Sequence, residues 1–321
     1  MRFLPSFFAL AVALAPFAAW GQAYPVKPIR VVVPFSPGGT SDIIGRTLGQ
    51  KLSEAWSQPV IMDNRAGVAG SLGAANAAKS PPDGYTLLVG NVGPVAVNNS
   101  IYKSTGYDPL KDFSPITLAV TAPQIVVVHP SVPARTFKEF AALVKRHQGK
   151  INYGSSGPGS ISHLSAELYK RMTKTDMLHV PFKASALITI ALLSGEVDVA
   201  FSDMAVVLPH VQAGRLRALA VTGAKPTPLV PGLPTVAESG LPGFVMTSWW
   251  GMLAPAGTPR PIVTRLNTEL TRILRLADVQ KTFATLGVDA MTSTPEEFSA
   301  FIKTEYVKYA KLIQEIGIEK Q

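Results

Sequence analysis

Two glycine-rich turns hold the residue types and the spacing that best suit chemistry in this chain. The first, residues 34–42, follows an apolar run and reads PFSPGGTSD, and the second, residues 154–160, reads GSSGPGS. Glycine lets the backbone turn sharply, so the N–H groups at the start of the next helix point outward. Because such N–H groups and the aligned peptide dipoles attract anions, the two turns predict a protein that closes over a small anion.

The first turn supplies backbone donors for a carboxylate. We expect the N–H groups of Gly38, Gly39 and Thr40 to hold the anion, while Asp42 caps the next helix or orders a water. A plain strand-to-helix turn would need the same glycines, and Asp is favoured in any first helical turn. The second turn provides a matching half-site, which favours the binding interpretation.

The second turn adds hydroxyl groups to its backbone donors. Ser155, Ser156, Gly157 and Ser160 are candidates for contacts with the same anion. Ser160 alternatively serves only as a helix cap. His163 lies in the first turn of the following helix, where it either faces the cleft or packs as an ordinary buried histidine.

Three further polar residues follow predicted strands. Asn91 contributes an amide to the site or merely forms a turn. Lys183 is a cation for the cleft or an ordinary surface lysine, and Asp203 binds a ligand ammonium or caps the segment after it. Ligands of open parallel sheets bind at the carboxyl ends of strands, so all three are candidate ligand-binding residues.

The motifs of the common enzyme classes are absent from the sequence. Proline replaces the second glycine of a nucleophile elbow at residues 154–158, and residues 157–162 lack the third glycine of a dinucleotide fingerprint. The five histidines have no paired ligand spacing, and there is no cysteine. We therefore predict no catalytic residue, no metal site and no cofactor.

The first 23 residues have the features of a secretory signal peptide. Residues 1–2 give a positive start, residues 7–19 are almost entirely apolar, and residues 21–23 read GQA, a small-residue cleavage site. The apolar run is too short for a retained membrane helix. We predict a mature chain that begins at Tyr24 and lies in the periplasm, with which the lack of cysteine is compatible.

The chain carries a net charge of +9, of which +8 remains once the leader is removed. The lysines and arginines are scattered and the chain is exported, so we predict no nucleic-acid partner. A basic surface attracts small anionic solutes, although a solvated basic surface without any specific partner is an alternative interpretation. We expect a monomer.

Short apolar runs alternate with helical patterns, which predicts an α/β fold. We expect strands at residues 29–34, 60–63, 86–90, 125–129, 151–154, 178–181, 197–202, 216–222 and 249–254. Helical spacing of apolar residues predicts a helix after each glycine-rich turn and two more after residue 258. The last of these opens with a capping box at residues 294–297, which read TPEE.

The order of these elements predicts two similar halves with a cleft between them. A strand–turn–helix–strand unit at residues 31–63 occurs again at 151–181. We assign residues 24–122 together with 227–321 to domain 1, and residues 123–226 to domain 2. The chain would cross between the halves at residues 113–130 and 216–255, and these crossing strands would act as a hinge.

Several longer segments match one family in order. They include YPVKPIR at 24–30, PFSPGG at 34–39, PDGYTL at 82–87, HVPFK at 179–183 and APAGTP at 254–259. From Tyr24 to near Gly317 the chain resembles the Bug-type periplasmic solute receptors of tripartite tricarboxylate transport systems. The resemblance implies a type II periplasmic binding protein, a two-domain Venus flytrap with mixed sheets. It also implies a small carboxylate ligand and delivery to a membrane permease.

The resemblance also implies site residues by position, with recognition largely through backbone groups and ordered waters. It places Phe35, Ser36, Gly38, Gly39 and Asp42 in the first cradle, and Ser155, Ser156, His163, Lys183 and Asp203 opposite them. Relatives usually have RPGAGG where residues 65–70 read RAGVAG, and glycine where Ala184 stands. The extra methyl groups narrow the approach to the backbone. Whether the ligand carries an amine, an aromatic ring or a second carboxylate stays open.

We expect capture by domain closure, because contacts made only in the closed form shift the population toward it. The permease would then recognise the closed form. A ligand sensor that signals to a membrane partner would need the same closing receptor and is the alternative function. A secreted enzyme acting on a carboxylate is a third possibility, against which the missing catalytic residues argue.

Overall fold

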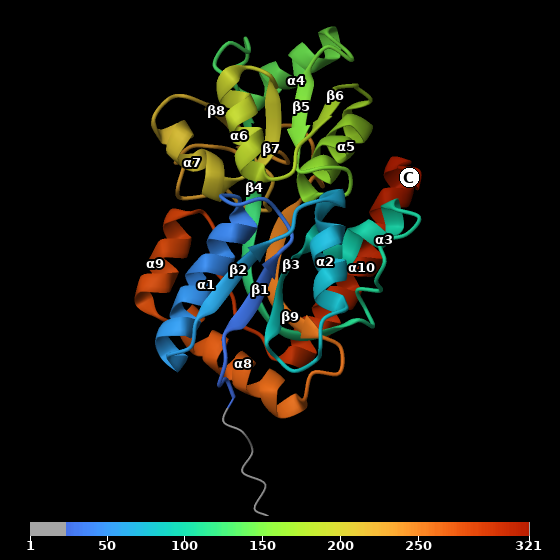
Figure 1. Cartoon of the computed structure of the whole chain (residues 1–321). Coiled ribbons are helices and arrows are strands. Elements are labelled where there is room, and N and C mark those ends of the chain that lie inside the picture. The colour runs from blue at the N-terminus through green and yellow to red at the C-terminus, as the bar shows by residue number, and fades with distance from the viewer. Residues whose placement is uncertain (1–23, 321) are drawn as a thin grey trace, which may run out of the picture.

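The computed structural model describes residues 24–320, so the predicted signal peptide lies outside the described residues. Two lobes are stacked along the long axis of the molecule (Figure 1). The strands are β1 (Ile29–Val33), β2 (Val60–Asn64), β3 (Thr86–Asn91), β4 (Phe113–Val128), β5 (Asn152–Ser155), β6 (Leu178–Pro181), β7 (Val199–Asp203), β8 (Arg217–Val221), β9 (Thr247–Pro255) and β10 (Asp289–Ala290).

Helices cover the sheet in both lobes. They are α1 (Thr40–Trp56), α2 (Ser71–Ala78), α3 (Asn98–Ile101), α4 (Phe137–Arg146), α5 (Ile161–Thr173), α6 (Ser185–Ser194), α7 (Met204–Gln212), α8 (Arg260–Leu274), α9 (Ala277–Thr285) and α10 (Pro295–Ile316). A short 3-10 turn, η1 (Val68–Gly70), precedes α2, and a π-helical turn, η2 (Gly93–Val97), precedes α3. No helix in the described part of the chain combines the length and the apolar character needed to cross a membrane.

The sheet is mixed in both lobes. The first lobe, the lower one in Figure 1, contains β1, β2, β3 and β9, and the second lobe contains β5, β6, β7 and β8. In the first lobe β1 pairs in parallel with β2 and β3, while β9 runs antiparallel to β3. In the second lobe β5 pairs in parallel with β6 and β7. This arrangement agrees with the mixed α/β fold that the sequence predicts.

Strand β4 belongs to both lobes. Its residues from Phe113 to Pro123 pair with β9, and those from Gln124 to Val128 pair with β7 and β8. The chain returns to the first lobe after β8, where the N–H of Gln124 donates to the hydroxyl of Thr222 at 2.8 Å. The sequence predicted a strand only from residue 125, because the earlier part of β4 contains Pro115 and Pro123 and proline is uncommon inside strands.

Alternating residues of β1 face two different layers of helices. Val31 and Val33 pack in one buried cluster with Leu48 of α1 and Leu266 of α8. Val32 packs in another with Ala74 of α2 and with residues of α10. Because successive side chains of a strand point to opposite faces, helices cover the strand on both sides, and β1 reads as an unbroken apolar run.

Three helices follow Pro259, whereas the sequence predicted two. Helix α10 begins with the predicted capping box, in which Thr294 and Glu297 cap each other's backbone N–H groups. The unpredicted helix is α9, which is short and buries few residues, among them Val279 and Phe283. Helix α6 was also not predicted. Its sequence, SALITIALLS, is apolar on nearly every side, so it has no stripe by which helical periodicity could be recognised.

Candidate functional site

A cavity lies between the two lobes, where the first lobe's β3 and the second lobe's β7 end. Side chains and backbone of both lobes line it, and among these described residues there is no lysine and no arginine. Small hydroxyl side chains are the commonest group, and two tryptophans of β9, Trp249 and Trp250, form an apolar part of the wall. Recognition in such a cavity depends on backbone groups and hydroxyls rather than on cationic side chains.

Four helices begin at this cavity. Thr40 opens α1, Ile161 opens α5 and Ser185 opens α6, and each of these residues lines the cavity. Asp203, which precedes α7, lines it as well. The first N–H groups of a helix lack partners within the helix, and the helix dipole makes that end positive. The cavity is therefore suited to an anion without any basic side chain.

The first glycine-rich turn is fixed by Asp42 from behind. The Asp42 carboxylate accepts hydrogen bonds from the N–H of Gly38 at 3.0 Å, from Arg46 Nε at 2.9 Å and from Asn64 Nδ2 at 2.9 Å. Burial acts to raise the pKa of Asp42, but the hydrogen bonds from Arg46, Gly38 and Asn64 outweigh it and lower the pKa. Asp42 therefore stays ionised and shapes the turn, and it does not line the cavity.

The lobes touch across the cavity. The N–H of Thr40 in the first lobe donates to Ser185 Oγ in the second at 3.3 Å. The hydroxyl of Tyr102, also in the first lobe, donates to the carbonyl of Pro158 at 2.6 Å. A Cβ placed on Gly39 would lie 3.3 Å from Ser185 Oγ, which is tighter than an ordinary contact. Glycine at position 39 thus allows the close approach of the two lobes.

Ser160 caps a helix and also lies at the cavity. Its Oγ caps α5 by accepting from the N–H of His163 at 3.3 Å and donates to the carbonyl of Gly157 at 2.7 Å. It also lines the cavity, together with Ser156 of the same turn. The cap and the closed loop hold the second turn in place while Ser156 is left at the cavity.

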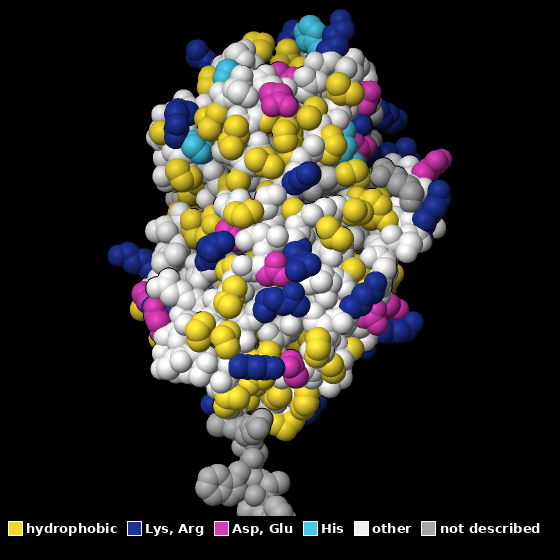
Figure 2. Space-filling view, viewed as in Figure 1, with side chains coloured by type: hydrophobic (Ala, Val, Ile, Leu, Met, Phe, Trp, Pro, Cys, Tyr) yellow, Lys and Arg dark blue, Asp and Glu magenta, His cyan; other side chains and the backbone are white. Residues whose placement is uncertain are grey.

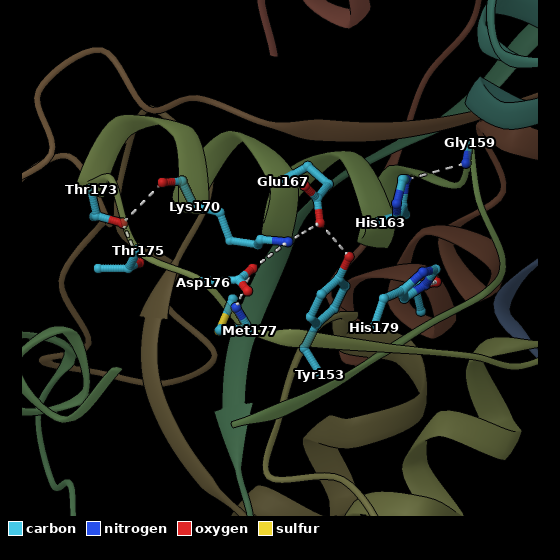
Figure 3. Close-up of polar contacts among 11 residues, drawn as sticks. Tyr153, Gly159, His163, Glu167, Lys170, Thr173, Thr175, Asp176, Met177 and His179 are labelled. Atoms are coloured by element: carbon cyan, nitrogen blue, oxygen red, sulfur yellow. Dashed lines mark hydrogen bonds and ion pairs between the residues drawn. The ribbon is translucent and has the colours of Figure 1, made fainter. Parts of the chain in front are cut away.

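Two histidines support the second turn from inside the second lobe (Figure 3). His163 Nδ1 accepts from the N–H of Gly159 at 3.3 Å, and His179 Nε2 lies 2.5 Å from Ser155 Oγ. The His163 and His179 rings are 4.6 Å apart, and the Tyr153 ring stacks on His179 at 4.9 Å. Burial lowers the pKa of each histidine to about 4, so both rings are neutral near pH 7.

The same cluster continues through Glu167 and Lys170 to Asp176, whose side chain is exposed (Figure 3). The hydroxyl of Tyr153 donates to Glu167 Oε1 at 2.6 Å, and Lys170 Nζ bonds to that oxygen at 2.9 Å and to Asp176 Oδ1 at 3.1 Å. Burial and the neighbouring Glu167 raise the pKa of Tyr153 well above its usual value. This network holds the Tyr153 ring against His179 and keeps the turn rigid.

The fourteen candidate residues of the sequence fall into two sets. Seven line the cavity, namely Phe35, Gly39, Thr40, Asn91, Ser156, Ser160 and Asp203. The other seven do not line it: Ser36, Gly38, Asp42, Ser155, Gly157, His163 and Lys183. Of this second set, Gly157 and Lys183 border a neighbouring groove that also contains Phe35 and Ser156. Asp42, Ser155 and His163 instead hold the turns that present the lining residues.

Sequence reasoning missed a larger group of lining residues. They include Ser41, Gly93, Gln124, Ser162, Ser185, Ser202, Ser248, Trp249 and Trp250. Ser41 lies inside the first predicted turn but was not among the candidates. Ser162 lies two residues beyond the second turn, so a wider window there would have included it. Gln124 lies inside β4 and Ser248 is the second residue of β9, where the sequence carries no sign of a site. No group of acidic or histidine side chains suited to a metal ion occurs within residues 24–320.

Asp203 is the acidic residue of the cavity wall. In the sheet it pairs with Gln124 of β4, and its Oδ1 accepts from Ser248 Oγ at 3.3 Å. Burial raises the pKa of Asp203, and hydrogen bonds from Thr40, Ser248 and Gln124 only partly oppose this rise. Its side chain makes no capping hydrogen bond to α7, so the capping role that the sequence left open is not the one observed.

Comparison with known proteins places this site in a family. The model of the TctC family, described as tripartite tricarboxylate transporter family receptor, matches residues 44–318. BugT of Bordetella pertussis is 34% identical over 312 residues, which cover 97% of this chain and 95% of BugT.

Two solved structures share the fold over nearly their whole length. Rpa4515 of R. palustris with adipate has a TM-score of 0.91 at 34% identity and covers 93% of this chain and 100% of its own. MatC of Rhodopseudomonas palustris with bound malate has a TM-score of 0.87 at 32% identity, and the match covers 90% of this chain and 100% of the MatC chain. These likenesses confirm the predicted type II binding-protein fold. The chain therefore belongs to the TctC family of tripartite tricarboxylate transporter receptors, which are periplasmic solute-binding proteins and not enzymes.

Proposed function

We propose that this receptor captures a small carboxylate in the cavity between its lobes and delivers it to the permease of a tripartite tricarboxylate-type transporter. The observation that carries the proposal is the meeting of four helix N-termini at a cavity that no lysine or arginine lines in the described chain. Such an end offers hydrogen-bond donors and positive potential to an anion. The relatives solved with adipate and with malate hold carboxylates, which supports this ligand class.

The carboxylate contacts would come from both lobes. On the first lobe, the N–H groups of Gly39 and Ser41 have no acceptor among the described residues, and both residues line the cavity. On the second lobe, the hydroxyls of Ser156 and Ser185 are available at the opposite wall. A carboxylate held by both sets would bridge the lobes, as capture by closure requires.

Entry of the ligand requires the lobes to separate. In the closed arrangement the cavity has a volume of about 30 Å³, which is room for roughly two water molecules. We propose that residues 24–122 with 227–321 move against residues 123–226, and that β4 together with the return segment near Thr222 is the hinge. Closure over the ligand would then create the surface that the permease recognises.

The experiment that tests the proposal is a thermal-shift screen of the mature protein after removal of bound ligand by unfolding and refolding. The panel comprises mono-, di- and tricarboxylates, acidic amino acids, aromatic acids and matched uncharged amides. A ligand at about a thousand times its dissociation constant stabilises the fold by roughly 4 kcal/mol. We expect shifts with acids and none with their amides. A cooperative protein that responds to no acid, or equally to amides, would contradict the carboxylate assignment.

Delivery needs a separate test, since a receptor can bind without transporting. Deletion of the gene should abolish uptake of the radiolabelled acid found in the screen, and restoration of the gene should recover it. Normal uptake in the deletion strain would contradict the transport role while leaving the binding role intact.

A further inference from the structure

The cavity wall holds polar atoms that lack partners. Asn91 Oδ1 and Ser202 Oγ are both buried and have no hydrogen-bond partner within the described residues, and both residues line the cavity. An amide oxygen can only accept a hydrogen bond. A buried polar atom left unpaired destabilises the structure. Asn91 Oδ1 therefore indicates that the occupant of the cavity brings a hydrogen-bond donor, whereas the Ser202 hydroxyl can donate or accept.

Asp203 adds an acidic group to the same wall. The neutral Ser248 hydroxyl donates to it, and no lysine or arginine of the described chain forms an ion pair with it. The side chain does not cap α7. A buried carboxylate with no cation beside it is an unfavourable feature in a closed cavity, unless a ligand supplies the missing charge.

The cavity wall therefore has two kinds of electrostatic feature. The N-termini of α1, α5 and α6 favour a carboxylate, whereas Asp203 would repel one and favour a cation. Ser248, which hydrogen-bonds to Asp203, is uncharged, and so are Thr40 and Gln124, which also lower its pKa. None of these side chains neutralises Asp203. An ammonium group near Asp203 would pair with it and favour its ionised form.

We propose that Asp203 accepts a hydrogen bond from an ammonium group of the ligand and thereby selects small carboxylates that carry an amine. Asn91 Oδ1 is a second acceptor for the same class of donor. The inference rests on the proposed function, because it needs a ligand carboxylate held at the helix N-termini. It goes further by assigning the ligand a zwitterionic character and by naming the residue that discriminates.

The test compares pairs of acids that differ only in the amine. Isothermal titration calorimetry of the ligand-free protein would use succinate with aspartate, glutarate with glutamate, and propionate with alanine, each amino acid in both stereoisomers. We expect at least one amino acid to bind tenfold or more tightly than its parent acid. In Asp203→Asn, which keeps the size of the side chain but removes its charge, the ratio of the two affinities should fall at least tenfold.

Two further variants keep the result interpretable. Asp289→Asn removes the same charge from an exposed residue of β10 outside the cavity, and it should leave the ratio as in the unmodified protein. If Asp203→Asn fails to fold, Asn91→Ala removes the second acceptor, and it should lower the ratio several-fold.

The possible outcomes separate this inference from the proposed function. Acids that bind with no preference for the amine, or a ratio that neither Asp203→Asn nor Asn91→Ala changes, would overturn the role of Asp203 while the carboxylate site stands. A receptor that binds no acid of either kind would overturn both.

Discussion

The N–H of Thr40 points at the hydroxyl of Ser185 across the cleft, with 3.3 Å between nitrogen and oxygen. Thr40 begins α1 in the first lobe and Ser185 begins α6 in the second, so the positive ends of two helices meet in the closed arrangement. Like ends of helix dipoles repel each other, and an anion between them removes the repulsion. We therefore expect ligand binding and closure to be coupled, with the empty protein favouring separated lobes.

The close approach at Gly39 can be tested with a double-mutant cycle. A Cβ at position 39 would meet Ser185 Oγ at 3.3 Å and Ala184 Cβ at 3.5 Å, so Gly39→Ala should weaken binding of the acid found in the screen about tenfold. Gly39→Val should weaken it further, with the free protein still folded. Because Ser185→Ala removes the nearer atom, Gly39→Ala combined with Ser185→Ala should show a favourable coupling energy in calorimetry. Unchanged affinity in Gly39→Val would contradict the backbone cradle.

Tyr102 and Tyr107 offer a matched pair of tyrosines. The hydroxyl of Tyr102 donates to Pro158 across the lobes, whereas that of Tyr107 donates to Pro94 within the first lobe. Loss of one neutral hydrogen bond costs about 1 kcal/mol. Tyr102→Phe should therefore weaken ligand binding about fivefold with little effect on the melting temperature of the free protein. Tyr107→Phe should lower that temperature and leave the affinity close to normal. The reverse pattern would argue against closure at Pro158.

The paired histidines make stability depend on pH. Burial lowers the pKa of His163 and of His179 to about 4, below the value of about 6.5 in the unfolded chain. The unfolded state binds more protons between these values, so stability should fall as pH drops from about 6.5 to 4. By linkage the loss is on the order of 3 kcal/mol for His163, and it is smaller for His179, because that ring is partly exposed and solvent screens it. Urea unfolding at pH 7 and pH 4.5 would measure it.

A variant without one of these histidines provides the control. His163→Gln removes one titrating ring, so the difference in unfolding free energy between pH 7 and pH 4.5 should become smaller. His129 is a histidine of the second lobe whose Nδ1 hydrogen-bonds to the hydroxyl and the N–H of Ser131, and His129→Gln should leave the difference as it was. Equal pH dependence in all three proteins would show that carboxylates alone cause it.

Asp42 is expected to act on affinity through the shape of the turn. In Asp42→Asn an amide NH₂ would face donors such as Arg46 Nε and the N–H of Gly38. The loss of these hydrogen bonds should destabilise the protein by about 2 kcal/mol. Because the turn would lose its shape, ligand binding should also weaken. Because the pKa of Asp42 is lowered in the folded protein, its ionised carboxylate stabilises the fold at pH values above the ordinary pKa of an aspartate. This stabilisation is lost as the pH falls below that value toward the lowered pKa. Asp63→Asn, at an ion pair with Arg30 and Arg65, should affect stability but not affinity. A normal affinity in Asp42→Asn would contradict the role of the turn.

The surface charge agrees with a small anionic ligand. In Figure 2 the lysines and arginines of the visible face lie on both lobes and are mixed with acidic side chains, so this face presents no continuous basic stripe. The overall positive charge would attract anionic solutes to the protein, whereas the helix N-termini would hold the anion inside the cavity. These are two separate effects. Raised salt should slow association of the ligand more than it speeds its release.

The local features of this site could be predicted because they depend on neighbouring residues. The first turn needs glycine at position 38, where φ is +81°, and the capping box of α10 needs Thr294 and Glu297 three residues apart. Such requirements are visible in any short stretch of sequence. The same holds for the buried β1, whose apolar run reflects helices on both faces.

The sequence by itself determined the two turns, the alternation of strands and helices, and the family. Only the tertiary structure decided which side chains face the cavity. Gln124 and Ser248 lie far apart in the chain and reach the cavity because β4 pairs with β7 in one lobe and with β9 in the other, while Ser185 reaches it from the start of α6. Pairing between distant strands depends on contacts along the whole sheet, and a serine carries no local mark of the neighbour that such pairing will give it.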